Sequence, residues 1–259
     1  MQKYKTKKRF GQHFLHDQGV IQKLIREVNP KDADQFVEIG PGLGALTFPL
    51  LDYVSELQVV EIDRDVIKRL EARKNPKLKI HGVDALKFDF NTLLEGQPLR
   101  VVGNLPYNIS TPLIFHLLAS ASNISDMHFM LQNEVVQRIS AKPGSKSFGR
   151  LSVMVQYYCE TVYLFFVGPE SFDPPPKVDS AILRLTPWKE KPFKANDDKQ
   201  LAMLVAQCFS MRRKTLRNNL KKLLSADQIE GLGIDPSIRS EMLSVEDFVR
   251  LSNLLPAAK

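Results

Sequence analysis

The sequence predicts an α/β protein with a largely parallel sheet, followed by a smaller all-helical domain. Short apolar stretches alternate with amphipathic helical patterns as far as about residue 185, which is typical of βα units. Acidic or amide side chains follow several of these apolar stretches, at the positions where the carboxyl ends of parallel strands meet. Beyond a proline-broken segment at residues 186–193, the pattern is helical only.

The first part of the chain is expected to fold into alternating strands and helices. Strands are expected near residues 35–39, 57–62, 78–80, 100–103, 127–132, 160–167 and 178–185. Helices are expected near residues 18–28, 43–52, 64–73, 111–120, 133–140 and 148–158. The last two strands follow each other without a helix, so we expect an antiparallel edge on the sheet.

We place a domain boundary after residue 187. The first domain would comprise residues 1–187 and the small helical domain residues 188–259. Helices of the second domain are expected near residues 197–210, 212–224, 226–230, 236–241 and 244–254. Ser244 and Asp247 form a plausible capping box at the start of the last of these helices.

The first strand runs into a glycine-rich turn. Its apolar residues 36–39 are followed by Gly40-Pro41-Gly42-Leu43-Gly44 and then by a helical pattern of leucines. Glycines permit positive φ angles and allow the backbone to approach a ligand closely. We therefore predict that Gly40, Gly42 and Gly44 bind a nucleotide-like cofactor.

Two acidic side chains follow the next two strands. Glu61 stands about 20 residues after the first glycine, where a carboxylate accepts hydrogen bonds from both ribose hydroxyls. Asp84 follows the strand near residues 78–80 and would accept from the 6-amino group of an adenine. The alternative interpretation of Asp84 is a cap for the turn that begins at Ala85.

The spacing of the glycines separates two classes of cofactor. The turn has the pattern G-x-G-x-G and not G-x-G-x-x-G, and no basic residue lies between Gly40 and Leu51 to pair with a pyrophosphate. S-adenosylmethionine carries an adenosine without phosphate, and its sulfonium and amino-acid end require oxygen acceptors. The sequence therefore predicts S-adenosylmethionine, and a nicotinamide-dependent oxidoreductase is the disfavoured alternative.

The turn after the fourth strand carries the predicted chemistry. Val101-Val102-Gly103 leads into Asn104, Leu105, Pro106 and Tyr107. The Asn104 side-chain oxygen and the Leu105 carbonyl can accept the two hydrogens of an aromatic amine, which localises its lone pair toward a methyl donor. Pro106 fixes the loop, and Tyr107 offers a face for the base. A plain strand-to-helix loop is the alternative interpretation.

Charge indicates a nucleic-acid partner. The chain has 36 Lys and Arg against 29 Asp and Glu, a net charge of +7. One basic cluster lies within residues 3–9, although a solvated face is the simpler interpretation of that run. In the predicted helix 212–224, Arg213, Arg217 and Lys221 would share one face opposite a face of leucines. The residues predicted to bind RNA are Arg212, Arg213, Lys214, Arg217 and Lys221.

Other classes of protein are disfavoured by composition. Cys159 and Cys208 show no pairing pattern, which fits a reducing compartment, and the five histidines show no metal-ligand spacing. No apolar run approaches the length of a membrane span. We expect a cytoplasmic monomer without a bound metal and without a membrane partner.

Five segments carry a resemblance to a known family. They are residues 9–15, 38–44, 60–63, 103–110 and 172–180. With these motifs the chain resembles the RsmA/KsgA family of small-subunit ribosomal RNA adenine dimethyltransferases, which are relatives of the erythromycin-resistance methyltransferases. The resemblance implies a Rossmann-like class I S-adenosylmethionine-dependent methyltransferase sheet, with residues 188–259 docking RNA.

The resemblance also implies roles for individual residues. It assigns cofactor contacts to His13, Leu15, Gly40, Glu61, Asp84 and Asn104. His13 stands where many relatives have Asn. Phe172, at the start of a proline-rich loop, becomes the second aromatic face over the base, although a lone Phe beside prolines is more often a core residue.

The implied reaction is dimethylation of the 6-amino groups of two adjacent adenosines near the 3′ end of 16S rRNA. The implied partner is this RNA within the small ribosomal subunit or its precursor, with a role in ribosome biogenesis. Two alternatives remain open. One is a ribosome-assembly binding factor with secondary catalysis, and the other is a resistance-type 23S rRNA adenine methyltransferase.

Overall fold

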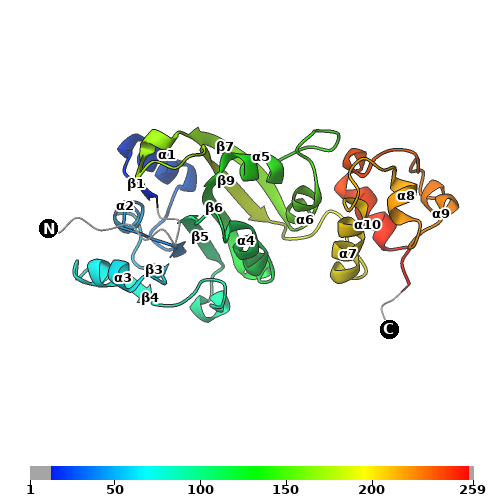
Figure 1. Ribbon diagram of the computed structural model, residues 1–259. Helices are drawn as coiled ribbons and strands as arrows, with labels where there is room; N and C mark the ends of the chain where they lie inside the picture. The colour runs from blue at the N-terminus through cyan, green and yellow to red at the C-terminus, as the bar shows by residue number, and fades with distance from the viewer. Residues whose placement is uncertain (1–12, 257–259) are drawn as a thin grey trace. The chain divides into compact units, whose positions relative to one another are not determined.

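The computed structural model describes residues 13–256, which fall into two compact units (Figure 1). Within these residues, the first unit comprises 13–136 and 162–187, and the second comprises 137–161 and 188–256. One boundary between the units lies between residues 187 and 188, where the sequence analysis places the domain boundary. Residues 137–161 group with the helical unit, although the sequence assigns them to the first domain. The basic cluster of residues 3–9 and part of the 9–15 motif lie outside the described residues.

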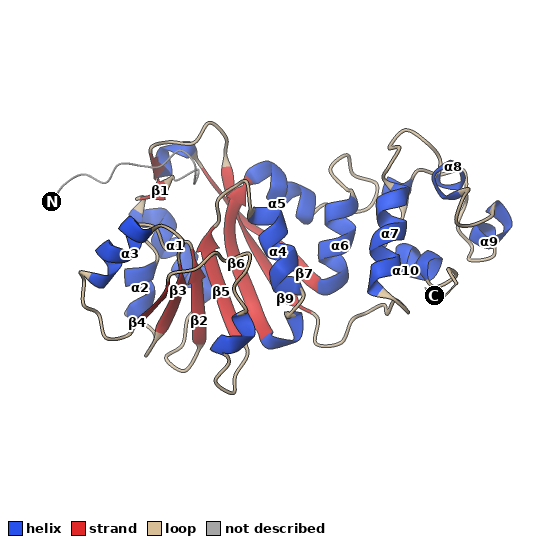
Figure 2. Cartoon of the chain, turned by 60° about the horizontal axis from the view of Figure 1, so that its bottom comes forward, coloured by secondary structure: helices blue, strands red, loops and turns tan. Residues whose placement is uncertain are grey.

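A seven-stranded sheet organises the first unit, and Figure 2 shows its strands side by side. In spatial order the strands are β4 (Leu78–His81), β3 (Leu57–Val60), β2 (Gln35–Ile39), β5 (Leu99–Asn104), β6 (Ile124–Gln132), β9 (Ser180–Pro187) and β7 (Cys159–Val167). The pairs from β4 to β6 are parallel, and β6 pairs with β9 in the antiparallel sense. The predicted α/β fold with an antiparallel edge is therefore confirmed.

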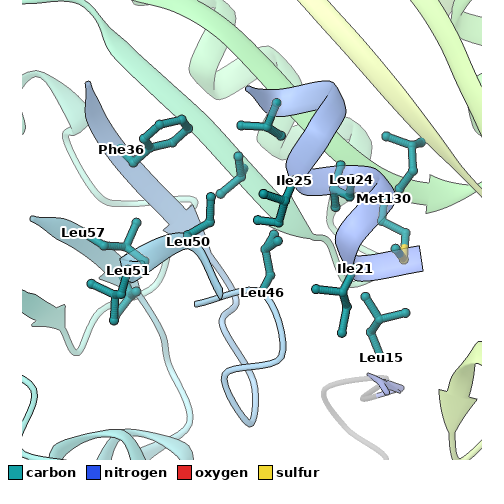
Figure 3. Packing of buried hydrophobic residues seen from close by; sticks show 14 of the residues in the cluster. Leu15, Ile21, Leu24, Ile25, Phe36, Leu46, Leu50, Leu51, Leu57 and Met130 are labelled. Atoms are coloured by element: carbon teal, nitrogen blue, oxygen red, sulfur yellow. The ribbon is translucent and has the colours of Figure 1, made fainter. Parts of the chain in front are cut away.

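The helices of the βα units follow the predicted order. They are α1 (Gln18–Val28), α2 (Thr47–Leu51), α3 (Arg64–Glu71), α4 (Ser110–Leu118) and α5 (Asn133–Ile139). In α1, Ile21, Leu24 and Ile25 recur at helical spacing and belong to one hydrophobic cluster, and Figure 3 shows Ile25 near Leu46, Leu24 near Met130 and Ile21 near Leu15. Asp17 caps this helix by accepting from the Gly19 and Val20 amides.

The helix after the glycine turn is shorter than the sequence predicts. We expected it near residues 43–52, but α2 begins only at Thr47. Gly40, Gly42 and Gly44 adopt φ angles of 68°, 55° and 88°, so the chain cannot enter a right-handed helix among them. Residues 40–46 therefore form an open loop above β2, and Leu43 is 40% exposed.

A small two-stranded sheet was not predicted. Its strands are β1 (Phe14–Leu15) and β8 (Phe172–Asp173), which pair in the antiparallel sense. Neither strand is long enough to show a period-2 pattern, so only the tertiary structure reveals the pairing. It holds His13, the residue before β1, beside the loop that follows β8: His13 Nδ1 lies 2.7 Å from the Pro174 carbonyl oxygen.

The second unit is helical. Its helices are α6 (Arg150–Tyr158), α7 (Asp198–Cys208), α8 (Leu216–Leu220), α9 (Ala226–Glu230) and α10 (Val245–Ser252). They share a core that includes Leu204, Leu220 and Phe248. The capping box of Ser244 and Asp247 forms as predicted. The helix expected near residues 236–241 is only a 3₁₀ turn at Ser240–Met242.

The prediction of one long basic helix over residues 212–224 is wrong. Residues 211–214 form turns, Thr215 is extended, and only Leu216–Leu220 is helical. The reason is a tertiary pairing, because the Leu216 amide donates to the Ile238 carbonyl at 2.7 Å and the Arg217 amide to the Pro236 carbonyl at 3.0 Å. These bonds replace the intrahelical bonds that the leucine pattern predicts.

The fold shows no sign of a membrane span or a metal cluster in the part of the chain that it describes. Between residues 13 and 256, no helix is both long and apolar enough to cross a membrane. Over the same residues, no group of three or more His, Cys, Asp and Glu side chains is placed to hold a metal ion.

Candidate active site

A cavity of about 260 Å³ opens at the carboxyl ends of β2, β3 and β5. Because these strands are parallel, the loops that follow them meet at one edge of the sheet. Nearly all the predicted cofactor and catalytic residues line the cavity. They are His13, Leu15, Gly40, Gly42, Glu61, Asp84, Asn104, Leu105, Pro106 and Tyr107.

Glu61 is held in a fixed orientation at the end of β3. Its Oε1 accepts hydrogen bonds from the Ile62 and Asp63 amides, both at 2.8 Å. Burial raises the pKa of this carboxyl group, and the amide donors oppose the shift. With one oxygen anchored, the carboxylate can present the other to a pair of hydroxyls.

Glu38 is the site residue that sequence analysis missed. It lies within the buried strand β2, is 2% exposed, and lines the same cavity. The Thr47 hydroxyl donates to its Oε2 at 2.6 Å. Burial, with the neighbouring charge of Glu61, raises the pKa of Glu38 to about 8. The sequence held one signal for it, which is a single carboxylate inside an apolar strand. A carboxylate is rarely buried without a partner, so its presence there indicates a special role.

Asp84 forms the cap that was the alternative interpretation, and it also lies where the predicted ligand role requires it. Its Oδ1 accepts from the Leu86 amide at 3.0 Å, which caps the turn after β4. The residue also lines the cavity. The cap fixes the carboxylate without occupying all its acceptor positions, so the second oxygen remains for a ligand.

The Asn104 amide is oriented by the segment before β1. Its Nδ2 donates to the His13 carbonyl at 3.2 Å, although the two residues are 91 positions apart. The side-chain oxygen is therefore the end of the amide that remains for a ligand in the cavity. The Leu105 amide donates to the Met130 carbonyl at 3.2 Å and holds the turn to β6.

Tyr107 stands three residues beyond Asn104. Its hydroxyl lies 2.8 Å from the Ser180 hydroxyl, and burial raises the pKa of the phenol. The His13 ring lies beside it, with 6.2 Å between centroids and 23° between the ring planes. The Tyr107 ring is thus held at its tip and flanked on one side.

Two predicted site residues are missing among the described residues that line the cavity. A Cβ atom on Gly44 would collide with the Phe48 ring, so this glycine serves the packing of the loop. Phe172 is only 2% exposed and belongs to the hydrophobic core around α1. In this conformation its ring has no free face for a base. Phe172 thus occupies the core position that was the alternative interpretation of this residue.

The loop geometry suits an adenosine with a cationic tail. A Cβ atom on Gly42 would stand 3.0 Å from the Phe14 ring, and one on Gly103 would stand 2.5 Å from the Ile39 carbonyl oxygen. Both glycines therefore allow chain segments to approach closely under the cavity. Leu43 and Ile62, which are 40% and 49% exposed, give apolar walls, and Glu38 supplies a buried carboxyl group that a cation would favour in its ionised form. S-adenosylmethionine fits a cavity with these apolar walls and oxygen acceptors.

Further cavity residues carry no sequence signal of their own. Most are apolar side chains that the pattern assigns to the core or to loops. They are Phe14, Leu24, Pro41, Leu43, Ala45, Leu46, Ile62, Leu86, Asn108, Ile109 and Met130.

The residues predicted to bind RNA lie in the second unit and are not on one helix face. Arg212 and Arg213 belong to the turn before α8, Arg217 to α8, and Lys221 to its end. The Arg212 Nε lies 3.3 Å from Glu241 Oε2, and its guanidinium also donates to the Lys146 carbonyl. Arg213 and Lys214 are exposed.

Curated relatives match this chain over nearly its whole length. The ribosomal RNA small subunit methyltransferase A of Hydrogenovibrio crunogenus is 58% identical over 260 residues, with 98% of each chain covered. The protein of the same name from Alcanivorax borkumensis is 56% identical over 256 residues, covering 98% of this chain and 91% of that protein.

Solved structures agree with the fold. A dimethyladenosine transferase from Plasmodium falciparum has a TM-score of 0.81 and 28% identity, covering 92% of this chain and 96% of the other. The 23S rRNA methyltransferase ErmE has a TM-score of 0.75 at 24% identity, with 93% and 99% covered, and shows the shared fold. The sheet is thus that of a class I methyltransferase.

The family model described as ribosomal RNA adenine dimethylase matches residues 3–256. This range includes both units and every residue of the cavity described above. The chain therefore belongs to the ribosomal RNA adenine dimethylase family, and it is a methyltransferase that uses S-adenosylmethionine.

Proposed function

We propose that the protein transfers methyl groups to the 6-amino groups of two adjacent adenosines near the 3′ end of 16S rRNA, within the small ribosomal subunit or its precursor. The observation that carries the proposal is the orientation of Asn104. Its Nδ2 donates to the His13 carbonyl, so its oxygen is left as an acceptor in the cavity that Tyr107 also lines. A planar amine requires such an acceptor at its edge and an aromatic ring at its face.

The cofactor would be held by the cavity wall that follows β2, β3 and β4. Glu61 would accept from the ribose hydroxyls, Asp84 from the adenine amine, and Glu38 would face the cationic end. The bound cofactor supplies an electrophilic methyl group on a sulfonium. The protein's task at this wall is to fix the direction in which that methyl group points.

The turn after β5 would activate the target amine. The Asn104 oxygen and the Leu105 carbonyl would accept the two amine hydrogens, and this localises the nitrogen lone pair toward the methyl group. Alignment of the reacting atoms supplies the main rate enhancement, for which roughly 7–11 kcal/mol is available. No strong base is needed, because the product ammonium loses its proton readily to water.

The target base must leave its stack to reach this turn. Tyr107 would then carry one face of the base, a contact worth about 1–3 kcal/mol. Phe172 as the second face stays a prediction, and this role requires its ring to move out of the core in which it is buried.

The second unit would hold the RNA. Arg213 and Lys214 are exposed cations in a turn that the core of the unit supports, and such side chains pair with phosphates. Relatives at 53–58% identity carry the name small subunit methyltransferase, which favours this subunit over the large one. A cytoplasmic location and a monomeric state belong to the same proposal.

Methyl incorporation into purified, undermethylated small and large ribosomal subunits tests the proposal. Labelled S-adenosylmethionine is supplied, and the RNA is digested to nucleosides. We expect dimethyladenosine in small-subunit RNA only. Label confined to large-subunit RNA would instead identify a resistance-type enzyme. Tight binding to the subunit without any label would identify an assembly factor.

A further inference from the structure

The position of the Tyr107 ring depends on a residue far away in the sequence. The Tyr107 hydroxyl lies 2.8 Å from the hydroxyl of Ser180, 73 residues later. Ser180 is the first residue of β9 and is fully buried. It does not belong to the cavity lining and takes no part in the mechanism above.

Ser180 is itself rigidly placed. It pairs with Gln132 in the antiparallel ladder of β6 and β9. The carbonyl of the preceding Asp179 accepts from the Asn133 amide at 2.9 Å. The side chain of Asn133 in turn accepts from the Tyr163 hydroxyl of β7 at 3.0 Å. The backbone on both sides of Ser180 is therefore tied to the sheet.

The tip of the tyrosine ring is the point where an anchor has most effect. A tyrosine turns about two side-chain torsions, and its hydroxyl oxygen lies on the axis of the second. A bond at the hydroxyl therefore restrains the first torsion, which sets where the ring lies, while the His13 ring flanks the ring itself. The position of the Tyr107 ring then sets the position of a base stacked on it, and so the distance at which the base amine meets the methyl group. Because alignment supplies the rate, a small error in this position slows transfer.

We propose that Ser180 is a positioning residue for methyl transfer, and that its hydroxyl holds the Tyr107 ring at the position where the target base stacks. The inference rests on the proposed function of the same cavity. Ser180 does not touch the base or the cofactor and acts only through the Tyr107 hydroxyl.

A purely structural role gives a different pattern of effects. If Ser180 only stabilised the fold, Ser180→Ala would lower the fraction of folded protein and leave the rate per folded molecule unchanged. If it positions Tyr107, the chemical step slows while release of RNA does not. Monomethylated adenosine then leaves the enzyme more often before the second transfer.

The test is a double-mutant cycle of Ser180→Ala and Tyr107→Phe, with Ser252→Ala as the control. Ser252 is also buried, and its hydroxyl donates to the Val249 carbonyl at 2.8 Å in the second unit. Single-turnover rates are measured at saturating cofactor with the RNA that the wild type methylates. The folded fraction is measured by denaturant unfolding, and mono- and dimethyladenosine are separated in the product.

We expect each single variant to slow transfer by about tenfold per folded molecule, the effect of one lost hydrogen bond. The double variant should be no slower than either single variant, because both changes remove the same bond. The fraction of product that is monomethyladenosine should rise in all three variants, and their affinity for the cofactor should not change. Ser252→Ala should match the wild type in all these measurements.

Two results would overturn the positioning role alone while the wild type transfers normally. One is a Ser180→Ala rate equal to that of the wild type per folded molecule. The other is a double variant whose rate loss is the product of the two single losses. If the wild type itself methylates neither subunit, the proposed function fails and this role fails with it.

Discussion

The two walls of the cavity are built in different ways. The wall that follows β2, β3 and β4 is held by contacts close in sequence: Glu61 to the next two amides, Asp84 to the amide two residues on, and Glu38 to Thr47 nine residues on. The wall that follows β5 is held by residues distant in sequence, because Asn104 is hydrogen-bonded to His13 and Tyr107 to Ser180.

This difference separates binding from transfer. The first wall is complete once the parallel strands pair, so changes in it should alter cofactor affinity alone. The second wall is complete only when the segment before β1 and the start of β9 are both in place. Changes there should alter the rate of transfer and leave cofactor affinity intact.

The largest effect is expected from Asn104→Ala. The change removes an acceptor that the reacting amine uses in the transition state, so the single-turnover rate should fall by roughly 10²–10³. Cofactor and RNA affinities should stay close to those of the wild type. Asn91→Ala, in an exposed turn of the same unit, is the matched control. Normal turnover in the Asn104 variant would remove this residue from the mechanism.

Glu61→Ala should act on the other wall. Loss of a charged acceptor for two hydroxyls should weaken S-adenosylmethionine binding by about 10- to 100-fold. RNA affinity should not change. Isothermal calorimetry measures the cofactor affinity, with Glu71→Ala at the exposed end of α3 as the control. Equal affinities in variant and wild type would exclude Glu61 from the site.

Glu38 should make cofactor binding depend on pH. Its pKa of about 8 means that it is mostly protonated at pH 7, and a cationic ligand favours its ionised form. Affinity should therefore rise roughly eightfold from pH 7 to pH 8.5 through this group. Glu38→Gln should remove that rise. The amino group of the ligand titrates in the same pH range, and the variant shows how much of the pH dependence comes from that amino group alone. An identical pH profile in both proteins would contradict the assignment.

The same group predicts the sign of a stability effect. Its folded pKa lies above the ordinary value of 4.5 for a glutamate, so the folded state binds the extra proton between about 4.5 and 8. Stability from this source is complete below pH 4.5 and is lost as the pH rises toward 8. Glu38→Gln should lessen that loss in denaturant unfolding.

The smallest effect is expected in the second unit. Arg213→Ala should weaken binding to the small subunit a few-fold and reduce the slope of log affinity against log salt by up to about one. Cofactor affinity and the single-turnover rate at saturating subunit should not change. Lys199→Ala, an exposed cation on α7, is the control. Equal slopes in both variants would show that Arg213 contacts no phosphate.

The first wall was largely predictable from the sequence because its signals are local. Apolar strands, glycines and the acids after them have fixed spacings that the sheet converts into fixed positions. Glu38 was not predicted, because the apolar strand around it has the pattern of a core strand, and only the structure places its buried carboxyl group at the cavity.

The remaining errors are tertiary in origin. The helix expected over 212–224 fails because the backbone at Leu216 and Arg217 bonds to residues 238 and 236. Nothing in the local leucine pattern encodes that partner. The core position of Phe172 follows in the same way from the pairing of β8 with β1, two strands too short to predict.

A crystal structure of the protein with S-adenosylhomocysteine and adenosine would show directly whether the second wall holds the target base. We expect the cofactor ribose on Glu61 and its adenine amine on Asp84. We expect the amine of the second adenosine within hydrogen-bond distance of the Asn104 side-chain oxygen, with the base on the Tyr107 ring. A second adenosine bound away from Tyr107, with Asn104 turned from its amine, would contradict this arrangement.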